Sequence, residues 1–131
     1  MEFKDNEAIY LQIAGYVSEH ILRGKWRPDD KIPSVRELAG DLQVNPNTVM
    51  RAYELLQGQE VIYNRRGLGF FVAEGAGARV RQQRRERFLS QDLPEIFHTM
   101  LLLDIGLPDL QRRYEEFRTT QSTSQPNENQ H

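Results

Sequence analysis

Apolar side chains recur at helical spacing near the start of the chain. The segment 7–24 carries apolar residues four positions apart, namely Ile9, Ile13, Val17 and Ile21. This spacing predicts a helix with one buried face, and Gly24 follows where a left-handed cap favours glycine. Trp26 is expected to pack back on the core, and Pro28 with the next two aspartates predicts a turn into a short extended segment.

Two shorter helices are predicted next, each with its own start signal. Ser34 and Glu37 have the spacing of a capping box, in which each side chain binds a backbone N–H group of the other residue. Asn45 suits the N-cap of the second helix, and Pro46 suits its first position, where no N–H group is needed. The two apolar faces are Val35, Leu38, Ala39 and Leu42, and then Val49, Ala52, Tyr53 and Leu56. Two short helices joined by a tight turn after a longer helix form a helix-turn-helix arrangement.

The segment after the second short helix predicts a β-hairpin. In VIYNRRGLGFFV, residues 61–72, the pattern on both sides of Arg66 and Gly67 favours β structure. Glycine allows the positive φ that a tight hairpin turn needs. A hairpin directly after such a helix pair is a wing. We therefore expect a mainly α fold with a small β-hairpin wing, in which a winged helix-turn-helix domain spans residues 1–73.

A helical region is predicted after a joint of small residues. The sequence AEGAGA, residues 73–78, has weak structural preference and indicates a hinge. A broad apolar stripe follows, which Pro94 interrupts either as a kink or as the start of a new segment. Gly106 and Pro108 then suit the end of one helix and the start of the next. The pattern predicts a helical hairpin within residues 74–118 and a polar, disordered tail over residues 119–131.

The predicted helical hairpin is too small to bury its own apolar side chains. Two helices alone have almost no interior, so we expect a second copy of the chain to cover the stripe and form a homodimer. The alternative is that these helices fold back on the winged domain. The expected dimer residues are Phe88, Leu89, Leu93, Ile96, Phe97, Met100, Leu101, Leu110, Tyr114 and Phe117.

Composition narrows the chemistry that the chain can perform. The 131 residues include no cysteine and only three scattered histidines, so no metal site is predicted. No nucleophile–base pair or phosphate-cradling loop indicates an enzyme, and no cofactor is implied. The sequence has no apolar run of membrane-spanning length and no signal peptide at its start. We therefore expect a cytoplasmic protein without a membrane partner.

Charge is unevenly distributed along the chain. The formal net charge is −2, whereas five arginines fall within residues 79–87. Local basic patches can therefore exist on an acidic protein. This basic run is either a solvated helix face or an auxiliary contact to phosphates.

Several motifs in a fixed order resemble one protein family. The stretch IPSVRELAGDLQVNPNTVMRAYELL, followed by RRGLGFFV, is similar to the DNA-binding domain of the GntR family of bacterial transcription regulators. VNPNTV with RAY resembles the YtrA-like branch of that family, and the resemblance covers roughly residues 8–72. It implies a regulator, mostly a repressor, that binds a double-stranded DNA operator. The short C-terminal region also resembles that branch and has no obvious pocket, so no effector ligand is assigned.

Polar residues at the starts of the two short helices are candidates for phosphate contacts. Backbone N–H groups and the helix dipole favour anions there. The candidates are Ser34, Asn45, Asn47 and Thr48. Simple helix capping is the alternative explanation for the first two, and the two roles are compatible.

Arginines supply the other candidate DNA contacts. Arg36 matches the family arginine that reaches into the major groove, and Arg51 lies on the polar face of the second short helix. The family wing enters or lines the minor groove, which implies contacts there by Arg65, Arg66 and Gly67. A solvated loop is the alternative for the wing arginines.

The chain departs from the family pattern at three positions. Pro46 stands where many relatives carry an arginine, and Met50 stands where some have a second basic residue, so base recognition falls more heavily on Arg36, Asn47 and Arg51. Glu60 stands where the family usually ends the recognition helix with glycine. Either a non-glycine residue adopts the left-handed conformation there, at a cost of about 1 kcal/mol, or the helix stops at Gly58.

Two functions remain from different classes. The first is a sequence-specific transcription regulator that binds a two-fold symmetric operator as a homodimer, with the recognition helix in the major groove and the wing at the minor groove. The second is a winged-helix module for protein–protein assembly that does not recognise DNA sequence. The two differ in sequence preference and in the dependence of binding on salt.

Overall fold

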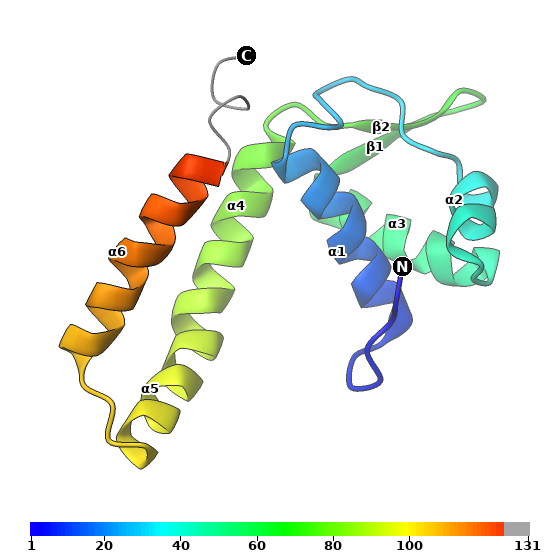
Figure 1. Cartoon of the computed structure of the whole chain (residues 1–131). Helices are drawn as coiled ribbons and strands as arrows, with labels where there is room; N and C mark the ends of the chain where they lie inside the picture. The colour runs from blue at the N-terminus through cyan, green and yellow to red at the C-terminus, as the bar shows by residue number, and fades with distance from the viewer. Residues whose placement is uncertain (125–131) are drawn as a thin grey trace. The chain divides into compact units, whose positions relative to one another are not determined.

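The computed structural model describes residues 1–124 (Figure 1). Its first compact unit, residues 1–85, begins with three helices that pack together. They are α1 (Ile9–Leu22), α2 (Val35–Leu42) and α3 (Pro46–Gly58), and α3 packs against both of the others. The predicted start signals are all present, with a capping box at Ser34 and an N-cap at Asn45. Gln43 forms the α2 C-cap in the left-handed region, φ 57°, which turns the chain sharply into α3.

The core lies between the helices and the wing. It contains the expected apolar faces of α1 and α3 and part of the face of α2. Ile9, the first residue of the predicted apolar row, lies in α1 as its spacing indicated, but its side chain is 44% exposed. Residues four apart rotate by about 40° per step around a helix, so a stripe of such residues drifts away from the core. Trp26 is half-buried against the core, as expected.

The wing is a two-stranded antiparallel hairpin. Strands β1 (Ile62–Arg65) and β2 (Gly69–Val72) pair with Arg65 opposite Gly69. Gly67 has φ 80°, and the Leu68 N–H group donates to the Arg65 carbonyl at 2.8 Å, which closes the predicted turn. The extended segment expected after Pro28 lies along β2, where it forms an isolated bridge between Lys31 and Phe71.

The polypeptide is helical from Ala76 to Leu102. This stretch contains α4 (Ala76–Arg87), the π-helical segment η1 (Phe88–Asp92) and α5 (Leu93–Leu102). Pro94 was expected as a kink or a new start, and α5 does begin at Leu93 with Pro94 in its first turn, while the helix widens just before it. The Leu93 N–H group donates to the carbonyl of Phe88 five residues earlier. A π turn accommodates a proline that lacks its own N–H group and crowds the preceding turn.

The boundary between the two compact units lies between Arg85 and Glu86, whereas we expected it after residue 73. The glycine-rich joint is short, because α4 begins within it at Ala76. Ala76 and Val80 are buried in the core of the first unit, which therefore keeps most of α4. The small side chains that suggested a hinge instead permit close packing.

The second unit contains η1, α5 and the last helix, α6 (Leu107–Ser124). We expected a disordered tail from residue 119, but α6 continues to Ser124. The hydroxyl groups of Thr119 and Thr120 donate to carbonyls four residues earlier, which keeps their polar groups inside the helix. The rest of the expected tail, residues 125–131, lies outside the described residues.

Candidate nucleic-acid interface

The start of α3 presents polar side chains but few free backbone N–H groups. The Asn47 N–H group donates to Oδ1 of Asn45 at 2.8 Å, and the Thr48 N–H group donates to the Asn45 carbonyl at 3.0 Å. Pro46 has no N–H group. A phosphate at this helix end would therefore contact side chains, mainly those of the exposed Asn45 and Asn47 and the half-buried Thr48. The expected contribution of backbone N–H groups in this first turn is not available.

The start of α2 combines a closed capping box with an exposed arginine. The Ser34 N–H group donates to Oε1 of Glu37 at 3.0 Å, and the Glu37 N–H group donates to Oγ of Ser34 at 3.1 Å. The bond from the Ser34 backbone lowers the pKa of Glu37, so this carboxylate is negative where a phosphate was expected. Arg36, one residue before Glu37, is exposed and supplies the positive charge at this end.

Arg51 is the predicted recognition residue that the structure restrains most. Its guanidinium carbon lies 3.9 Å from the centroid of the Tyr10 ring, so α3 is stacked on α1 at this point. Such a cation–π contact contributes about 0.5–1 kcal/mol at an exposed site. The guanidinium edge stays available because a stacked cation keeps its in-plane N–H groups. Sequence patterns gave no indication that Tyr10 is the partner.

The wing carries its arginines in two different settings. The guanidinium of Arg65 lies over the rings of Phe71 and Tyr63, at 5.2 and 5.7 Å from their centroids. Arg66 and Gly67 are exposed at the turn itself, next to Leu68, which is 59% exposed. The wing thus presents one arginine packed against aromatic rings at the end of β1 and one exposed arginine in the turn that follows.

Tyr53 is a core residue of α3 that contacts both the start of α2 and the wing. It is completely buried on α3, and its hydroxyl donates to the Pro33 carbonyl, next to the α2 N-cap, at 2.7 Å. Its ring meets Phe70 of β2 edge to face at 5.0 Å between centroids. Burial raises the pKa of the Tyr53 phenol, which stays a neutral donor. One side chain therefore connects α3, the start of α2 and the wing.

The end of α3 combines both alternatives that the sequence left open. The helix ends at Gly58, and Glu60 nevertheless adopts the left-handed conformation, with φ 60°. Nη1 of Arg79 donates to the carbonyls of Glu60 and Glu74, at 2.9 and 2.8 Å. These bonds hold the turn from α4, so the helix end depends on an arginine of the basic run.

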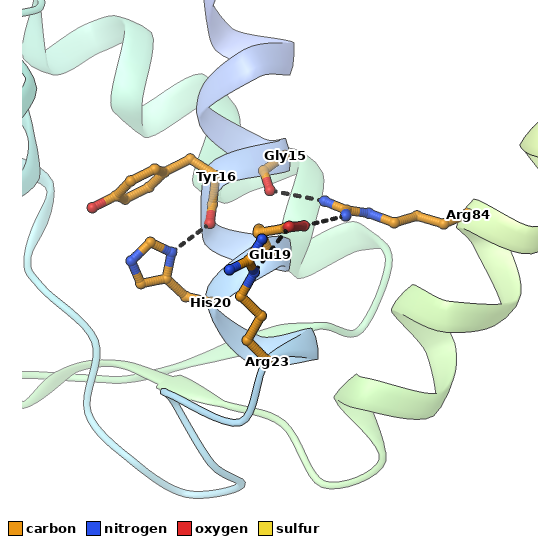
Figure 2. Close-up of polar contacts among 6 residues, drawn as sticks. All are labelled: Gly15, Tyr16, Glu19, His20, Arg23 and Arg84. Atoms are coloured by element: carbon orange, nitrogen blue, oxygen red, sulfur yellow. Dashed lines mark hydrogen bonds and ion pairs between the residues drawn. The ribbon is translucent and has the colours of Figure 1, made fainter. Parts of the chain in front are cut away.

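Arg84 also bonds within the protein, which neither interpretation of the basic run anticipated. Figure 2 shows its guanidinium on α1, where Nη2 donates to the Gly15 carbonyl at 3.0 Å and Nη1 donates to Oε2 of Glu19. The Arg84 hydrogen bond is the main cause of a lowered Glu19 pKa, with a further contribution from Arg23. Glu19 was absent from the predicted site because nothing in its local sequence marks a partner 65 positions away.

The two histidines within residues 1–124 have structural or surface positions. The His20 ring contacts the rings of both Tyr16 and Trp26, at 4.3 and 4.6 Å between centroids. Its Nδ1 is 2.9 Å from the Tyr16 carbonyl (Figure 2). His98 is exposed. Within residues 1–124, no cluster of His, Cys, Asp and Glu side chains is suited to a metal ion. None of the described helices is long and apolar enough to cross a membrane.

Most of the expected dimer residues are exposed apolar side chains of the second unit. Of these ten side chains only Met100 is buried, while Leu93 and Leu110 are half-buried. Leu101 is 83% exposed, and the neighbouring Leu102 and Leu103, absent from the predicted set, are 79% and 61% exposed. The remaining seven expected residues, Phe88, Leu89, Ile96, Phe97, Leu101, Tyr114 and Phe117, are all exposed.

Comparison with known proteins identifies the first unit and much of the second. The family model described as bacterial regulatory proteins, gntR family, matches residues 9–72. The regulator YhcF of Bacillus subtilis is 43% identical over 75 residues, which cover 57% of this chain and 62% of YhcF. The transcriptional repressor YtrA of the same organism is 42% identical over 73 residues, which cover 56% of each chain. The chain thus spans about three fifths of the length of these curated relatives.

Solved structures extend the similarity beyond the first unit. A GntR-family regulator from Bacteroides thetaiotaomicron is 46% identical with a TM-score of 0.73, and the match covers 87% of this chain and 99% of that one. The DNA-binding domain of AraR, solved in complex with its operator ORR3, is 36% identical with a TM-score of 0.51 over 56% of this chain and 86% of that one. The expected family and winged-helix fold are confirmed, and the similarity to YtrA fits the YtrA-like branch. The chain belongs to the GntR family of bacterial regulatory proteins.

Proposed function

We propose that the chain binds a two-fold symmetric operator as a homodimer and represses transcription in the bacterial cytoplasm. The observation that carries the proposal is the surface built around Tyr53, where α3, the start of α2 and the wing are fixed in one unit. The same fold occurs in the AraR domain that was solved on an operator. The name of YtrA as a repressor supports the sign of regulation.

The residues of this surface divide into base contacts and backbone contacts. Arg36, Asn47 and Arg51 are proposed to contact bases in the major groove, because all three are exposed on the two helices. The wing is proposed to lie at the minor groove, where Arg66 and Gly67 approach most closely. The remaining predicted residues are proposed to contact phosphates and position the unit, and they are Ser34, Asn45, Thr48 and Arg65.

The second unit supports the homodimer. A cluster that includes Leu101, Leu102 and Leu103 is exposed in the single chain, whereas exposed apolar patches of this kind usually mark an interface. A second copy is the occupant that suits a DNA-binding fold of this class, because two-fold proteins match two-fold operators. We therefore propose residues 86–118 as the dimer-forming region and the ten expected side chains as its contacts.

Selection of bound duplexes from a random pool tests this proposal. The full chain is expected to enrich one half-site in two inverted copies, and binding to that site should fall steeply with salt as phosphate contacts are screened. Failure to enrich a symmetric site would contradict the proposal. Transcription in vitro from a promoter that contains the selected operator tests whether the protein represses or activates transcription. Repression predicts fewer transcripts as protein is added.

A further inference from the structure

The start of α1 is held by a buried glutamine side chain rather than by an N-cap. Ala8 stands at the N-cap position and makes no side-chain capping bond. Gln12, which is only 9% exposed, instead bonds the segment before the helix. Its Nε2 donates to the carbonyls of Lys4 and Glu7, both at 2.8 Å, and its Oε1 accepts the Lys4 N–H group at 2.8 Å. The first turn of α1 and the residues before it are therefore fixed to one another.

Tyr10 lies in this first turn and contacts α3. Its side chain is half-buried and packs against the core. The guanidinium carbon of Arg51 lies 3.9 Å from the centroid of its ring, whereas cation–π contacts extend to about 6 Å. The helices that carry the two residues also pack against each other. The ring beneath the guanidinium therefore belongs to a rigid part of the first unit.

Arg51 gains order from this contact. It is exposed on α3, and an exposed arginine has many rotamers whose freedom is lost when the side chain is fixed against a ligand. Stacking on the ring restricts those rotamers in advance, while the in-plane N–H groups stay available to donate to a base. Asn47, another proposed base contact, lies four residues earlier on the same side of α3. Tyr10 therefore acts on the face of α3 that the proposed function assigns to bases.

We propose that Tyr10 is a positioning residue that orients Arg51 before DNA binds, and thereby sets how strongly the protein distinguishes the base pair that Arg51 contacts. This inference rests on the proposed function, which assigns Arg51 to the major groove. A guanidinium distinguishes bases when two of its donors meet two acceptors of one base, which requires a defined position and plane. Without the ring, Arg51 has to be ordered by the DNA itself, and that cost weakens binding to the correct base pair.

Two other roles for Tyr10 make different predictions. If its hydroxyl bound a phosphate, Tyr10→Phe would weaken binding to all DNA sequences evenly. If its ring only filled space beside the core, Tyr10→Leu would lower stability and leave base preference unchanged. Orientation of Arg51 requires the aromatic ring but not the hydroxyl. Tyr10→Phe should therefore keep the base preference that Tyr10→Leu relaxes.

The experiment measures the affinity of the full chain for an operator and its single-base-pair variants. The operator is the duplex that the wild-type chain selects from a random pool. Wild type, Tyr10→Phe, Tyr10→Leu and Arg51→Ala are compared on each variant. Tyr16→Leu is the matched control, because Tyr16 is also a half-buried tyrosine of α1 but contacts the rings of His20 and Trp26. Urea unfolding measures the stability of every variant and confirms that each is folded.

The expected result is a loss of preference at one place in the half-site. Arg51→Ala should abolish the preference at one base pair, and Tyr10→Leu should reduce the preference at that same base pair by about two- to tenfold. This range corresponds to the cost of ordering one flexible side chain on binding. Tyr10→Phe and Tyr16→Leu should keep the wild-type preference at every position. Combining Tyr10→Leu with Arg51→Ala should cause no further loss at this base pair, because the ring acts through the guanidinium.

Three results would overturn the inference and leave the proposed function in place. Wild-type base preference in Tyr10→Leu would make the ring a packing residue only. An even loss of affinity in Tyr10→Phe would make its hydroxyl a DNA contact, and a gain of affinity in Tyr10→Leu would mean that stacking withholds Arg51 from DNA. If wild type selects no operator, or if Arg51→Ala changes no base preference, the proposed role of Arg51 fails and the inference fails with it.

Discussion

Replacing Leu101 by aspartate should dissociate the dimer while leaving the isolated chain folded. Leu101 is 83% exposed in the single chain, and exposed substitutions usually change folding stability by less than about 0.5 kcal/mol. In the proposed dimer the same side chain is covered. Burial of a leucine contributes about 1.5–3 kcal/mol, and two-fold symmetry places the change on both chains. The dimer should therefore lose about 3–6 kcal/mol, which raises its dissociation constant about 10²- to 10⁴-fold.

Sedimentation velocity over a dilution series measures this effect directly. Leu68→Asp is the matched control, because Leu68 is also an exposed leucine, at 59%, but lies at the wing tip of the first unit. The control should keep the wild-type dissociation constant and lose DNA affinity. Leu101→Asp should sediment as a monomer at concentrations where wild type is a dimer. An unchanged dissociation constant for Leu101→Asp would place the interface elsewhere and refute the reasoning.

Three further predictions concern specificity, stability and pH. Arg36→Ala should lower the preference for operator over random DNA by about 1–3 kcal/mol, while Arg66→Ala should weaken binding to all DNA sequences more evenly. Equal losses of affinity for both variants in competition titrations would reject this division into base contacts and backbone contacts. Tyr53→Phe should reduce the free energy of unfolding by about 1–2 kcal/mol, because the half-buried Pro33 carbonyl loses its donor. Urea unfolding should show this loss with an unchanged m-value. Glu19 has a pKa lowered from its ordinary value of 4.5 by its bond to Arg84, so its charged form stabilises the fold above that pH. The destabilisation caused by Arg84→Ala should therefore be present at neutral pH and disappear as the pH falls below 4.5 through the lowered value.

Local signals in the sequence predicted the starts of helices and the wing. Ser34 with Glu37, and Asn45 with Pro46, each satisfy backbone groups within a few residues, so their geometry is specified by neighbours along the chain. Gly67 likewise meets a conformational need of its own turn. Motifs of this kind predicted the elements of the fold because they depend on short spacings alone, whereas the family was inferred from a resemblance of longer stretches to known proteins.

Contacts between distant segments could not be predicted in the same way. Arg51 was correctly placed on an exposed helix face, but its stacking on Tyr10 depends on how α1 packs against α3. Arg84 belongs to a run of arginines that look alike in sequence, and only the docking of α4 distinguishes it from Arg81. Tertiary packing determines the contacts that orient a candidate site, whereas the residue types in the site can be identified from the sequence.

Local preference also misled the prediction at both ends of the second region. The small residues around Ala76 suggested a joint, yet their size lets α4 pack closely on the core. The segment after Arg118 suggested a tail because it is polar, contains proline and has no apolar residues; it begins with Thr119 and Thr120. Their hydroxyl groups instead bond back to the carbonyls of Glu115 and Glu116, and α6 continues. In both places, favourable contacts outweighed weak intrinsic preferences.

The most direct test of the proposed dimeric regulator is the stoichiometry of its complex with the selected operator. Native mass spectrometry of the full chain on the intact operator and on a duplex with one half-site scrambled counts the bound chains. The proposed function predicts two chains on the intact operator and a loss of affinity of at least tenfold on the scrambled duplex, since each mismatched position costs about 1–3 kcal/mol. One chain per intact operator, or equal affinity for the two duplexes, would contradict it.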